Sequence, residues 1–394
     1  MGTALHLALL VPVAIALLSS GATYWQGWAY FSEEGTPHDA ETEAVSIIVP
    51  LRGKPHGIAD LLDRLLEQDG VGPVEAIVAV EEGADPATDQ VRALAKSRDR
   101  LRVVVAEEQG VSGTGKIANL IAGVSEARYD RLVFVDADVQ VAPGAVRRLL
   151  APLSDPSVGL VFAAQVGADS PNLPAAFNHV FVNDSAFLHG AAAYRGELPG
   201  AVGAFMATRR DVLEAVGGLS RFADQIVMDI PLGQAVQGAG FDLHLLRRPV
   251  RVGGGPETWR TVLRRHHRWM VTIRTYLPRF PAFVAGASLP ETWSLAFLAT
   301  AGALGAHVPL GLVGLGVVLA WKVGSLAFAN ARLVRDEGLW PRLWVALVAE
   351  LLWLGVFLWS LSTNRVYWAG RQFEVAPDGT KKLLESSSPQ ATER

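Results

Sequence analysis

Cysteine is absent from this sequence, and its absence excludes several kinds of chemistry. Without thiols the chain has no disulfide framework, no thiolate nucleophile and no cysteine-ligated zinc or iron–sulfur site. The 9 histidines do not occur in the HExxH spacing of a zinc hydrolase. Any metal ion must therefore bind to oxygen or imidazole ligands.

Charged residues are also scarce, because Asp, Glu, Lys and Arg make up 19% of the 394 residues while apolar residues make up 50%. This composition excludes a disordered chain and is more apolar than that of an ordinary soluble domain. The net charge of −4 gives no general attraction to a polyanion. We therefore expect no nucleic-acid partner, and the length suits about two or three domains.

The first apolar region lies at the N-terminus. Residues 5–21 carry no charge, and no Lys or Arg precedes Arg52. A stretch of this kind predicts a transmembrane helix, and we assign residues 1–24 to an N-terminal anchor. A cleaved signal peptide is the alternative, but its positively charged start is missing.

The second apolar region lies near the C-terminus. Residues 292–319 are uncharged, and residues 343–361 are apolar apart from Glu350. If the first stretch turns near residues 307–309, three spans fit within residues 290–362. All 11 tryptophans lie at Trp25, Trp28 or from Trp259 onward, as expected for rings at the headgroup level. Residues 44–255 are therefore predicted to form a soluble domain, followed by an Arg- and Trp-rich interfacial region (256–285), the spans and a polar tail (363–394).

Positive charge is concentrated before the second apolar region. Nine arginines lie between residues 247 and 279, with one acid, Glu257, among them. By the positive-inside tendency this flank is cytoplasmic. Three further crossings would place the tail outside, although the tail is basic at Arg365, Arg371, Lys381 and Lys382. The two rules conflict, so a re-entrant C-terminal segment is an alternative.

Strand-like and helix-like patterns alternate within the soluble domain. Apolar, largely β-branched runs at 44–50, 75–80, 101–106 and 132–135 are separated by helical patterns at 57–68, at 86–96 and from 116. Such alternation predicts a parallel sheet covered by helices, with a ligand site beyond the carboxyl ends of the strands.

Two acids follow the fourth strand pattern. In an extended chain Asp136 and Asp138 point the same way. Two hard oxygen donors so placed suit Mg²⁺ or Mn²⁺, which also binds nucleotide phosphates. The alternative is an aspartate that caps the next helix.

A glycine-rich stretch at 110–115 precedes Lys116. It matches the start of a P-loop, but Ile117 stands where that motif needs Ser or Thr. The pattern therefore favours a turn that lets Lys116 and backbone amides approach a diphosphate. A plain flexible loop is the alternative.

Two further features carry chemistry. Asp229 is flanked by Met228 and Ile230, and a carboxylate in such apolar surroundings is typical of a general base or acid, with a helix cap as the alternative. Arg265 and Arg268 are three residues apart on a predicted helix and share a face. Arginines that extend to the membrane interface are the alternative there.

This ordered set of motifs resembles the ceramide glucosyltransferase family and its bacterial relatives, which include hopanoid glycosyltransferases. The resemblance covers roughly residues 45–269, with a similar tail piece at 366–371. It rests on the segment 45–53, the acids near Glu82, Lys116 with Asn119, Asp136-Ala-Asp138, Asp229 and Arg265-His-His-Arg268-Trp269. It implies an α/β GT-A domain, a Rossmann-like nucleotide-sugar-binding fold, plus α-helical transmembrane segments.

The resemblance also implies roles for these residues. Asp229 would be the catalytic base, and Asp138, helped by Asp136, would hold Mg²⁺ or Mn²⁺. The donor would be bound by Pro50, Arg52, Glu81, Glu82, Lys116 and Asp136, with Glu82 or Glu81 on the uracil ring. Arg265, Arg268 and Trp269 would close over the diphosphate and the acceptor. The chain departs from its relatives at Met228, where they usually place a second acid.

The expected function is therefore membrane-bound, inverting transfer of a hexose from a UDP-sugar to a lipid hydroxyl. Ceramide is the first acceptor expected and a hopanoid polyol the second. A processive polysaccharide synthase and an inactive binding protein are the alternatives from other classes. The expected partners are the UDP-sugar, the lipid acceptor and the bilayer. The expected location is the bacterial inner membrane or an equivalent one, with the catalytic domain on the cytoplasmic side.

Overall fold

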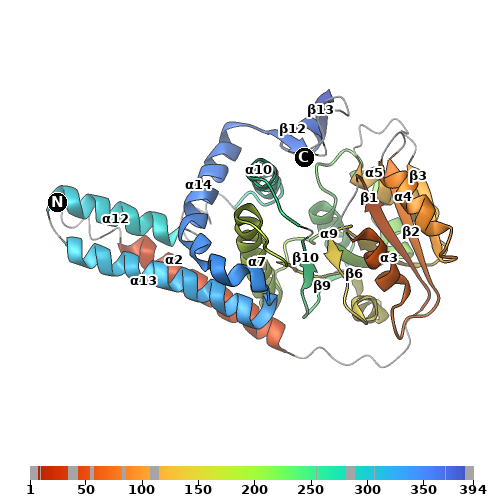
Figure 1. Cartoon of the computed structure of the whole chain (residues 1–394), viewed down its shortest axis with the longest axis horizontal. Helices are drawn as coiled ribbons and strands as arrows, with labels where there is room; N and C mark the ends of the chain where they lie inside the picture. The colour runs from red at the N-terminus through yellow and green to blue at the C-terminus, as the bar shows by residue number, and fades with distance from the viewer. Residues whose placement is uncertain are drawn as a thin grey trace. The chain divides into compact units, whose positions relative to one another are not determined.

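The computed structural model describes residues 8, 10–33, 43–53, 57–81, 86–106, 115–253, 255–279, 289–305, 307–368 and 370–386 (Figure 1). The chain divides into two compact units. The helical unit comprises Met1–Tyr30, Gly167–Tyr194 and Gly255–Asn364. The α/β unit comprises Phe31–Val166, Arg195–Gly254 and Arg365–Arg394.

A seven-stranded sheet forms the centre of the α/β unit, with the strand order β3-β2-β1-β4-β8-β6-β9. Its strands are β1 (Val45–Leu51), β2 (Val74–Glu81), β3 (Leu101–Ala106), β4 (Arg131–Val135), β6 (Val158–Phe162), β8 (Phe205–Arg209) and β9 (Asp242–Leu245). The helices of this unit are α3 (Ile58–Leu66), α4 (Pro86–Ala95), α5 (Lys116–Ser125), α6 (Ala145–Leu150), α8 (Arg210–Ala215) and α9 (Asp229–Gly238), with 3-10 turns at Ala151–Ser154 and Leu219–Phe222. The first four strands and the helices between them follow the predicted alternation.

The four predicted strands pair in parallel, but the complete sheet is mixed, because it also contains β8, which the alternation did not predict. This strand runs antiparallel to both β4 and β6, whereas β1 is parallel to β2 and β4, and β6 is parallel to β9. Parallel pairing depends on a helical crossover that returns the chain to the same edge. The chain reaches β8 from β6 through β7 and α7 (Leu173–Tyr194), which groups with the helical unit, and β8 then pairs with β4 and β6 in the opposite direction. The result is a mixed sheet.

Two small sheets complete the α/β unit. One has the order β5-β10-β7 and is formed by β5 (Val139–Gln140), β7 (Gln165–Gly167) and β10 (Val250–Val252). The other is antiparallel and is formed by β11 (Arg365–Trp368), β12 (Arg371–Val375) and β13 (Lys381–Ser386). The region expected as a polar tail therefore contains a three-stranded sheet.

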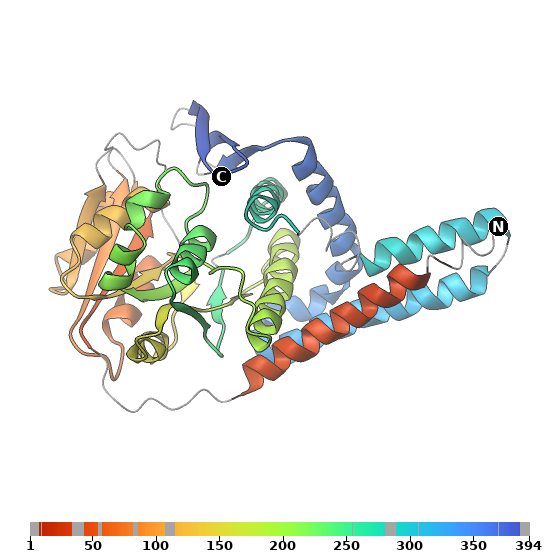
Figure 2. The same ribbon diagram turned by 180° about the vertical axis from the view of Figure 1, so that it is seen from behind.

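The helical unit contains α2 (Leu10–Ser32), α7, α10 (Trp259–Tyr276), α12 (Pro290–Leu304), α13 (Val308–Ala329) and α14 (Ala346–Ser362). A π turn (Asn330–Val334) and a 3-10 segment (Glu337–Val345) join α13 to α14. Helices α2, α12 and α13 lie side by side in both views (Figures 1 and 2). The turn expected near 307–309 falls between α12 and α13.

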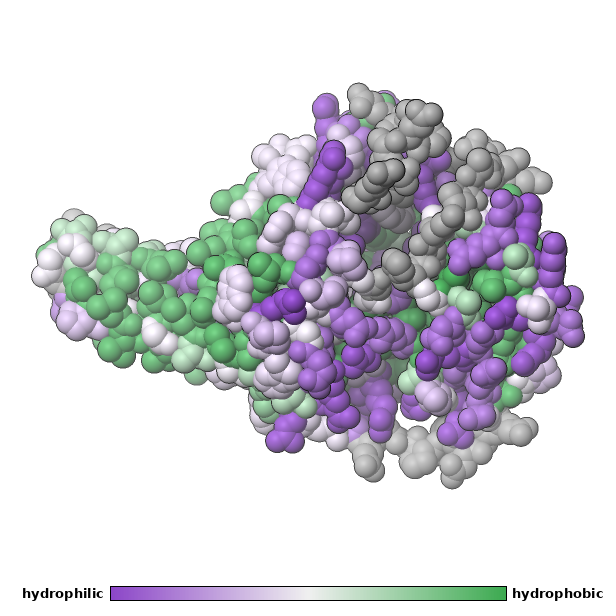
Figure 3. Space-filling model, viewed as in Figure 1, coloured by the Kyte–Doolittle hydropathy of each residue, from purple (hydrophilic) through white to green (hydrophobic). Residues whose placement is uncertain are grey.

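Two stretches among the described residues are long and apolar enough to cross a bilayer, Val308–Val334 and Glu337–Ser362. Helix α12 has 15 residues, fewer than the roughly 20 that a span needs. Helix α2 has 23 residues but is less apolar than these two stretches. Of the four spans that the sequence predicts, two therefore correspond to helices in the described part of the chain that are long and apolar enough to cross a bilayer. Apolar side chains gather on the surface over α12 and α13 (Figure 3).

Close packing between α5 and β1 fixes the edge of the sheet that carries the candidate site. A Cβ at Gly123 of α5 would lie 2.4 Å from Ile48 Cγ2, and Ile48 is fully buried on β1. A glycine inside a helix costs about 1 kcal/mol relative to alanine. Here it allows α5, which begins at Lys116, to lie directly against the strand.

We predict that Gly123→Ala lowers the free energy of unfolding by about 1–2 kcal/mol, because overpacking outweighs the gain in helix propensity. The melting temperature of the full chain in detergent measures this effect. Gly238→Ala is the matched control, since a Cβ there has no atom within 4 Å. Equal melting temperatures for the two variants would contradict the packing argument.

Candidate active site

The candidate site lies where β4 ends. Residues Leu132–Val135 of this strand are at most 1% exposed, which fixes the point where Asp136 leaves the sheet. The Asp136 amide donates to the Ala204 carbonyl at 2.8 Å, just before β8. Asp138 follows with an exposed side chain, and its carbonyl accepts from the Gly253 amide at 3.2 Å.

Lys116 joins this group from the first turn of α5. Its Nζ lies 2.6 Å from Asp136 Oδ1 and donates to the Gly203 carbonyl at 3.2 Å. Burial lowers the pKa of Lys116, but Asp136, Asp229 and Asp138 outweigh it and hold the pKa above its usual value. Burial also raises the pKa of Asp136 to about 6, with Lys116 opposing. The lysine therefore stays charged among acidic neighbours.

Asp229 is connected to the same lysine through Gly203. The Gly203 amide donates to Asp229 Oδ2 at 2.9 Å, while its carbonyl accepts from Lys116. Asp229 is the first residue of α9, and the residue before it, Met228, makes no side-chain cap. The Asp229 carboxylate therefore accepts from Gly203, which is 26 residues away in sequence. It does not act as the helix cap that was the alternative interpretation of the sequence.

Glu81 ends β2, and two arginines contact it. Its Oε1 lies 3.5 Å from Arg52 Nη1, and its Oε2 lies 3.6 Å from Arg371 Nη2. A Cβ at Gly115, which has a φ of 57°, would lie 2.6 Å from Glu81 Oε1. Glu81 is therefore next to the residue before Lys116. Glu82 and the glycine-rich turn at 110–114 lie outside the described residues.

Pro50 and the arginine–tryptophan motif are not part of the hydrogen-bond network of Lys116, Asp136 and Asp229. Pro50 lies in β1, in register with Ala79 of β2. Arg265, Arg268 and Trp269 all lie on α10 of the helical unit. Arg265 Nη2 contacts Glu257 Oε2 at 2.6 Å, and Trp269 stacks on Phe181 with ring centroids 5.4 Å apart.

The tail sheet contributes residues that the sequence did not single out. Lys381 is 4% exposed, and its Nζ donates to the carbonyls of Ala223 and Gln225, each at 2.9 Å. The Lys381 amide donates to the Asp224 carbonyl, and the Ile226 amide donates to the Gly379 carbonyl. These bonds hold the segment that leads into Asp229. Arg371 lay in a tail piece that resembles relatives, but no local pattern marked Lys381.

The carboxylates of Asp136 and Asp138 suit one divalent cation that a substrate also binds. Among the described residues no group of three or more His, Asp and Glu side chains could enclose a metal ion. Mg²⁺ commonly binds to one or two carboxylates together with substrate phosphates. Asp138 and Asp136 supply that number. With Asp229 they also give three carboxylates around one lysine, an excess of negative charge that favours a cation.

The mixed sheet, the two acids after β4 and the lysine beside them define a nucleotide-sugar glycosyltransferase of the GT-A fold. The chain belongs to glycosyl transferase family 21, whose model matches residues 8–381. Its reaction class is therefore hexosyl or related glycosyl transfer, EC 2.4.1.-.

Several solved structures are similar to this chain, and the first described here shares its fold with a TM-score above 0.5. A mannosyltransferase from Pyrobaculum calidifontis, in complex with GDP-Man and Mn²⁺, has a TM-score of 0.55 at 19% identity, covering 87% of this chain and 98% of that one. Glucosyl-3-phosphoglycerate synthase from Mycobacterium tuberculosis, with Mn²⁺, UDP and glucosyl-3-phosphoglycerate, has a TM-score of 0.39 at 16% identity, covering 59% and 79%. The same synthase with Mg²⁺ and UDP has a TM-score of 0.38 at 15% identity, also covering 59% and 79%.

We predict that Lys116→Met lowers turnover of the sugar nucleotide by about 10²–10³-fold, the loss typical of removing one preorganised charge partner. Release of the nucleoside diphosphate measures this effect. Lys96→Met, at an exposed position after α4, is the control. Turnover within a few-fold of the wild type would remove Lys116 from the site.

We predict that Lys381→Met costs about 1–3 kcal/mol of stability, because two backbone carbonyls lose their donor. It should also lower turnover, since the segment before Asp229 loses its support. Lys382→Met changes the exposed neighbouring residue and should lower neither stability nor turnover. Thermal unfolding and turnover of both variants measure the difference, and identical behaviour of the pair would contradict a supporting role for the tail.

Proposed function

We propose that this glycosyltransferase moves a hexose from a UDP-sugar to the hydroxyl of a membrane lipid, with inversion at the anomeric carbon. The observation that supports this most is the network in which Gly203 joins Lys116 and Asp229, with Asp136 on the same lysine. In this proposal Lys116 is the cation for the leaving diphosphate, and the nearby Asp229 is the carboxylate for the attacking hydroxyl. Both are needed for a single displacement.

In this mechanism Asp229 takes the proton of the lipid hydroxyl as its oxygen attacks the anomeric carbon. The new carbon–oxygen bond forms on the face opposite the bond to the diphosphate, which breaks and releases UDP. A general base contributes on the order of 10²–10⁴-fold, and alignment of the reactants contributes more. Lys116 neutralises charge that develops on the leaving diphosphate.

A divalent ion on Asp138 and Asp136 would supply Lewis-acid stabilisation of the same leaving group. Glu81, between Arg52 and Arg371, would accept a hydrogen bond from the uracil ring. Pro50 would border the donor from β1. As the resemblance implies, the diphosphate and the acceptor would be covered by Arg265, Arg268 and Trp269.

The membrane part of the proposal depends on the helical unit. In Val308–Val334 only 17% of the apolar window is buried, so this helix does not resemble the core helix of a soluble protein. Leu312 and Val313 are more than half exposed on it. Exposed apolar surface of this kind suits a lipid environment. The anchor that the sequence predicts at 1–24 and the arginine-rich composition of 256–285 are our further grounds for proposing a catalytic unit on the cytoplasmic side of a bacterial inner membrane or an equivalent one.

Ceramide is the first acceptor that we propose, because the motifs resemble ceramide glucosyltransferases. A hopanoid polyol is the second. Met228, which is 5% exposed, stands where relatives usually carry a second acid, and this departure is why the acceptor stays open between the two.

We predict that Asp229→Asn lowers transfer by about 10²–10⁴-fold and leaves binding of UDP intact, because it removes only the proton acceptor. Mass spectrometry of lipids from cells with the wild type, with Asp229→Asn and without the chain measures the product. Asp242→Asn, at the start of β9, is the control. One hexose added to a long-chain base supports ceramide, whereas a sugar on a pentacyclic triterpenoid supports the hopanoid. Equal glycolipid with Asp229→Asn would exclude Asp229 as the base.

A further inference from the structure

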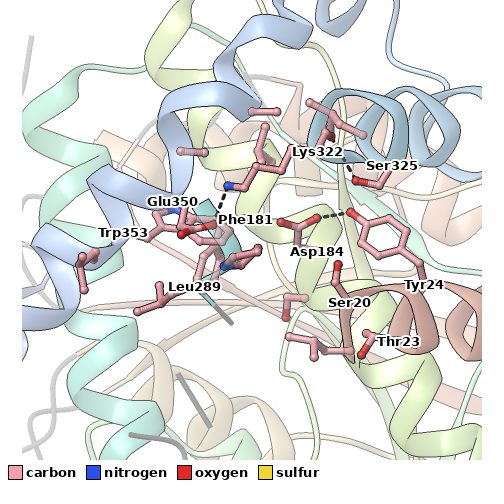
Figure 4. A pocket seen from close by; sticks show the side chains of 18 of the residues that line it. Ser20, Thr23, Tyr24, Phe181, Asp184, Leu289, Lys322, Ser325, Glu350 and Trp353 are labelled. Atoms are coloured by element: carbon pink, nitrogen blue, oxygen red, sulfur yellow. Dashed lines mark hydrogen bonds and ion pairs between the residues drawn. The ribbon is translucent and has the colours of Figure 1, made fainter. Parts of the chain in front are cut away.

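The helical unit contains a cavity of about 240 Å³ that the mechanism above does not use. Helices α2, α7, α10, α13 and α14 and the start of α12 form its wall (Figure 4). The volume exceeds the roughly 150 Å³ of an engineered cavity that binds benzene. It is below the roughly 300 Å³ at which sites for whole drug-sized ligands begin. The cavity therefore suits part of a molecule, such as a hydrocarbon segment next to a polar group.

Most of the wall is apolar. Leu188 of α7, Leu326 of α13, and Leu354 and Phe357 of α14 all line the cavity. Side chains of this kind favour hydrocarbon over water, because apolar area is removed from solvent on both sides of the contact. A purely polar metabolite would gain little from this surface.

One part of the wall carries a polar cluster. The Tyr24 hydroxyl donates to Asp184 Oδ1, and Lys322 Nζ contacts Glu350 at 2.9 Å and Glu291 at 3.1 Å. Figure 4 shows Asp184 between Tyr24 and the Lys322–Glu350 pair. Glu291 adjoins the cavity through Lys322, while the other four residues line it. The cavity thus joins a polar end to an apolar body.

The polar cluster has an excess of negative charge, with Asp184, Glu291 and Glu350 against Lys322. Burial raises the pKa of Asp184 to about 6, while the hydrogen bond from the Tyr24 hydroxyl and the charge of Lys322 act to lower it. A phosphate headgroup would bring like charge into a site where water screens poorly. A hydroxyl or an amide N–H can instead donate to Asp184. Glu350 already accepts from the Thr292 amide and hydroxyl, so it contributes its charge.

The cavity shares its wall with the helix that carries the arginine–tryptophan motif. Met270 and Ile273 of α10 line it directly. Phe181 also lines it and stacks on Trp269 of the same helix. A ligand in the cavity therefore contacts the helix assigned to the acceptor. This continuity favours the acceptor over a resident bilayer lipid.

We propose that this cavity binds the lipid acceptor, and that Asp184 and Glu350 select an uncharged lipid with hydroxyl or amide donors over a lipid phosphate. The assignment to the acceptor rests on the function proposed above. The selection for an uncharged headgroup rests on the charges of the cavity wall.

Binding is tested with the full chain in phosphatidylcholine nanodiscs and a photoreactive, clickable ceramide. Cross-linked peptides should come from α2, α7 and α14, and unlabelled ceramide should compete for them. Dioleoyl phosphatidic acid should not reduce labelling of the wild type by the ceramide probe. It should reduce labelling of Asp184→Asn, a substitution that keeps the size of the side chain and removes its charge. Labelling only outside the helices of the cavity, or equal competition by phosphatidic acid in the wild type, would overturn the proposal.

Catalysis is tested with a variant that fills the cavity. Leu188→Trp should reduce labelling and raise the KM for the lipid acceptor about tenfold, because overpacking displaces the ligand. The KM for the sugar donor should not change. Leu312→Trp is the matched control, since Leu312 is exposed on α13 and does not line the cavity. Equal acceptor KM values for the two variants would refute the assignment.

The two experiments separate this inference from the proposed function. If cells make no glycolipid while ceramide cross-links inside the cavity, the transferase function toward lipid fails and the selectivity of the cavity stands. If glycolipid forms and Leu188→Trp leaves the acceptor KM unchanged, the cavity assignment fails and the function stands.

Discussion

Lys116 holds together carboxylates that would otherwise repel one another. Its ammonium pairs with Asp136, and through Gly203 it is connected to Asp229. The fold brings these groups from three places, since Lys116 begins α5, Asp136 follows β4 and Asp229 begins α9. One lysine does not balance the carboxylates around it, so the cluster suits a divalent cation that arrives with a diphosphate.

The chain after the last helix completes this unit. Arg371 of β12 contacts Glu81 at the end of β2, while Lys381 and its neighbours hold the segment before Asp229. The tail sheet therefore contacts Glu81, which we propose binds the uracil ring, and supports the segment before Asp229, which we propose is the general base. The segment that the sequence predicted to be a polar tail is thus part of the α/β unit.

The sequence predicted those parts that local patterns determine. The runs at 44–50 and 132–135 correspond to β1 and β4 within one residue, because buried strands need continuous apolar residues. The positions of Asp136 and Asp138 follow directly from the end of β4. The antiparallel β8 and the role of Lys381 could not be predicted, because they depend on contacts between distant residues. Lys381 and Ala223, for example, are 158 positions apart.

The most direct test of the central claim is the affinity of UDP for the full chain in detergent, measured by calorimetry with Mn²⁺ and with a chelator. The account predicts that Mn²⁺ strengthens UDP binding markedly, because the cation relieves the excess negative charge around Lys116. It also predicts that Asp138→Asn loses this gain. Equal affinity for UDP with and without Mn²⁺ in the wild type would contradict the account.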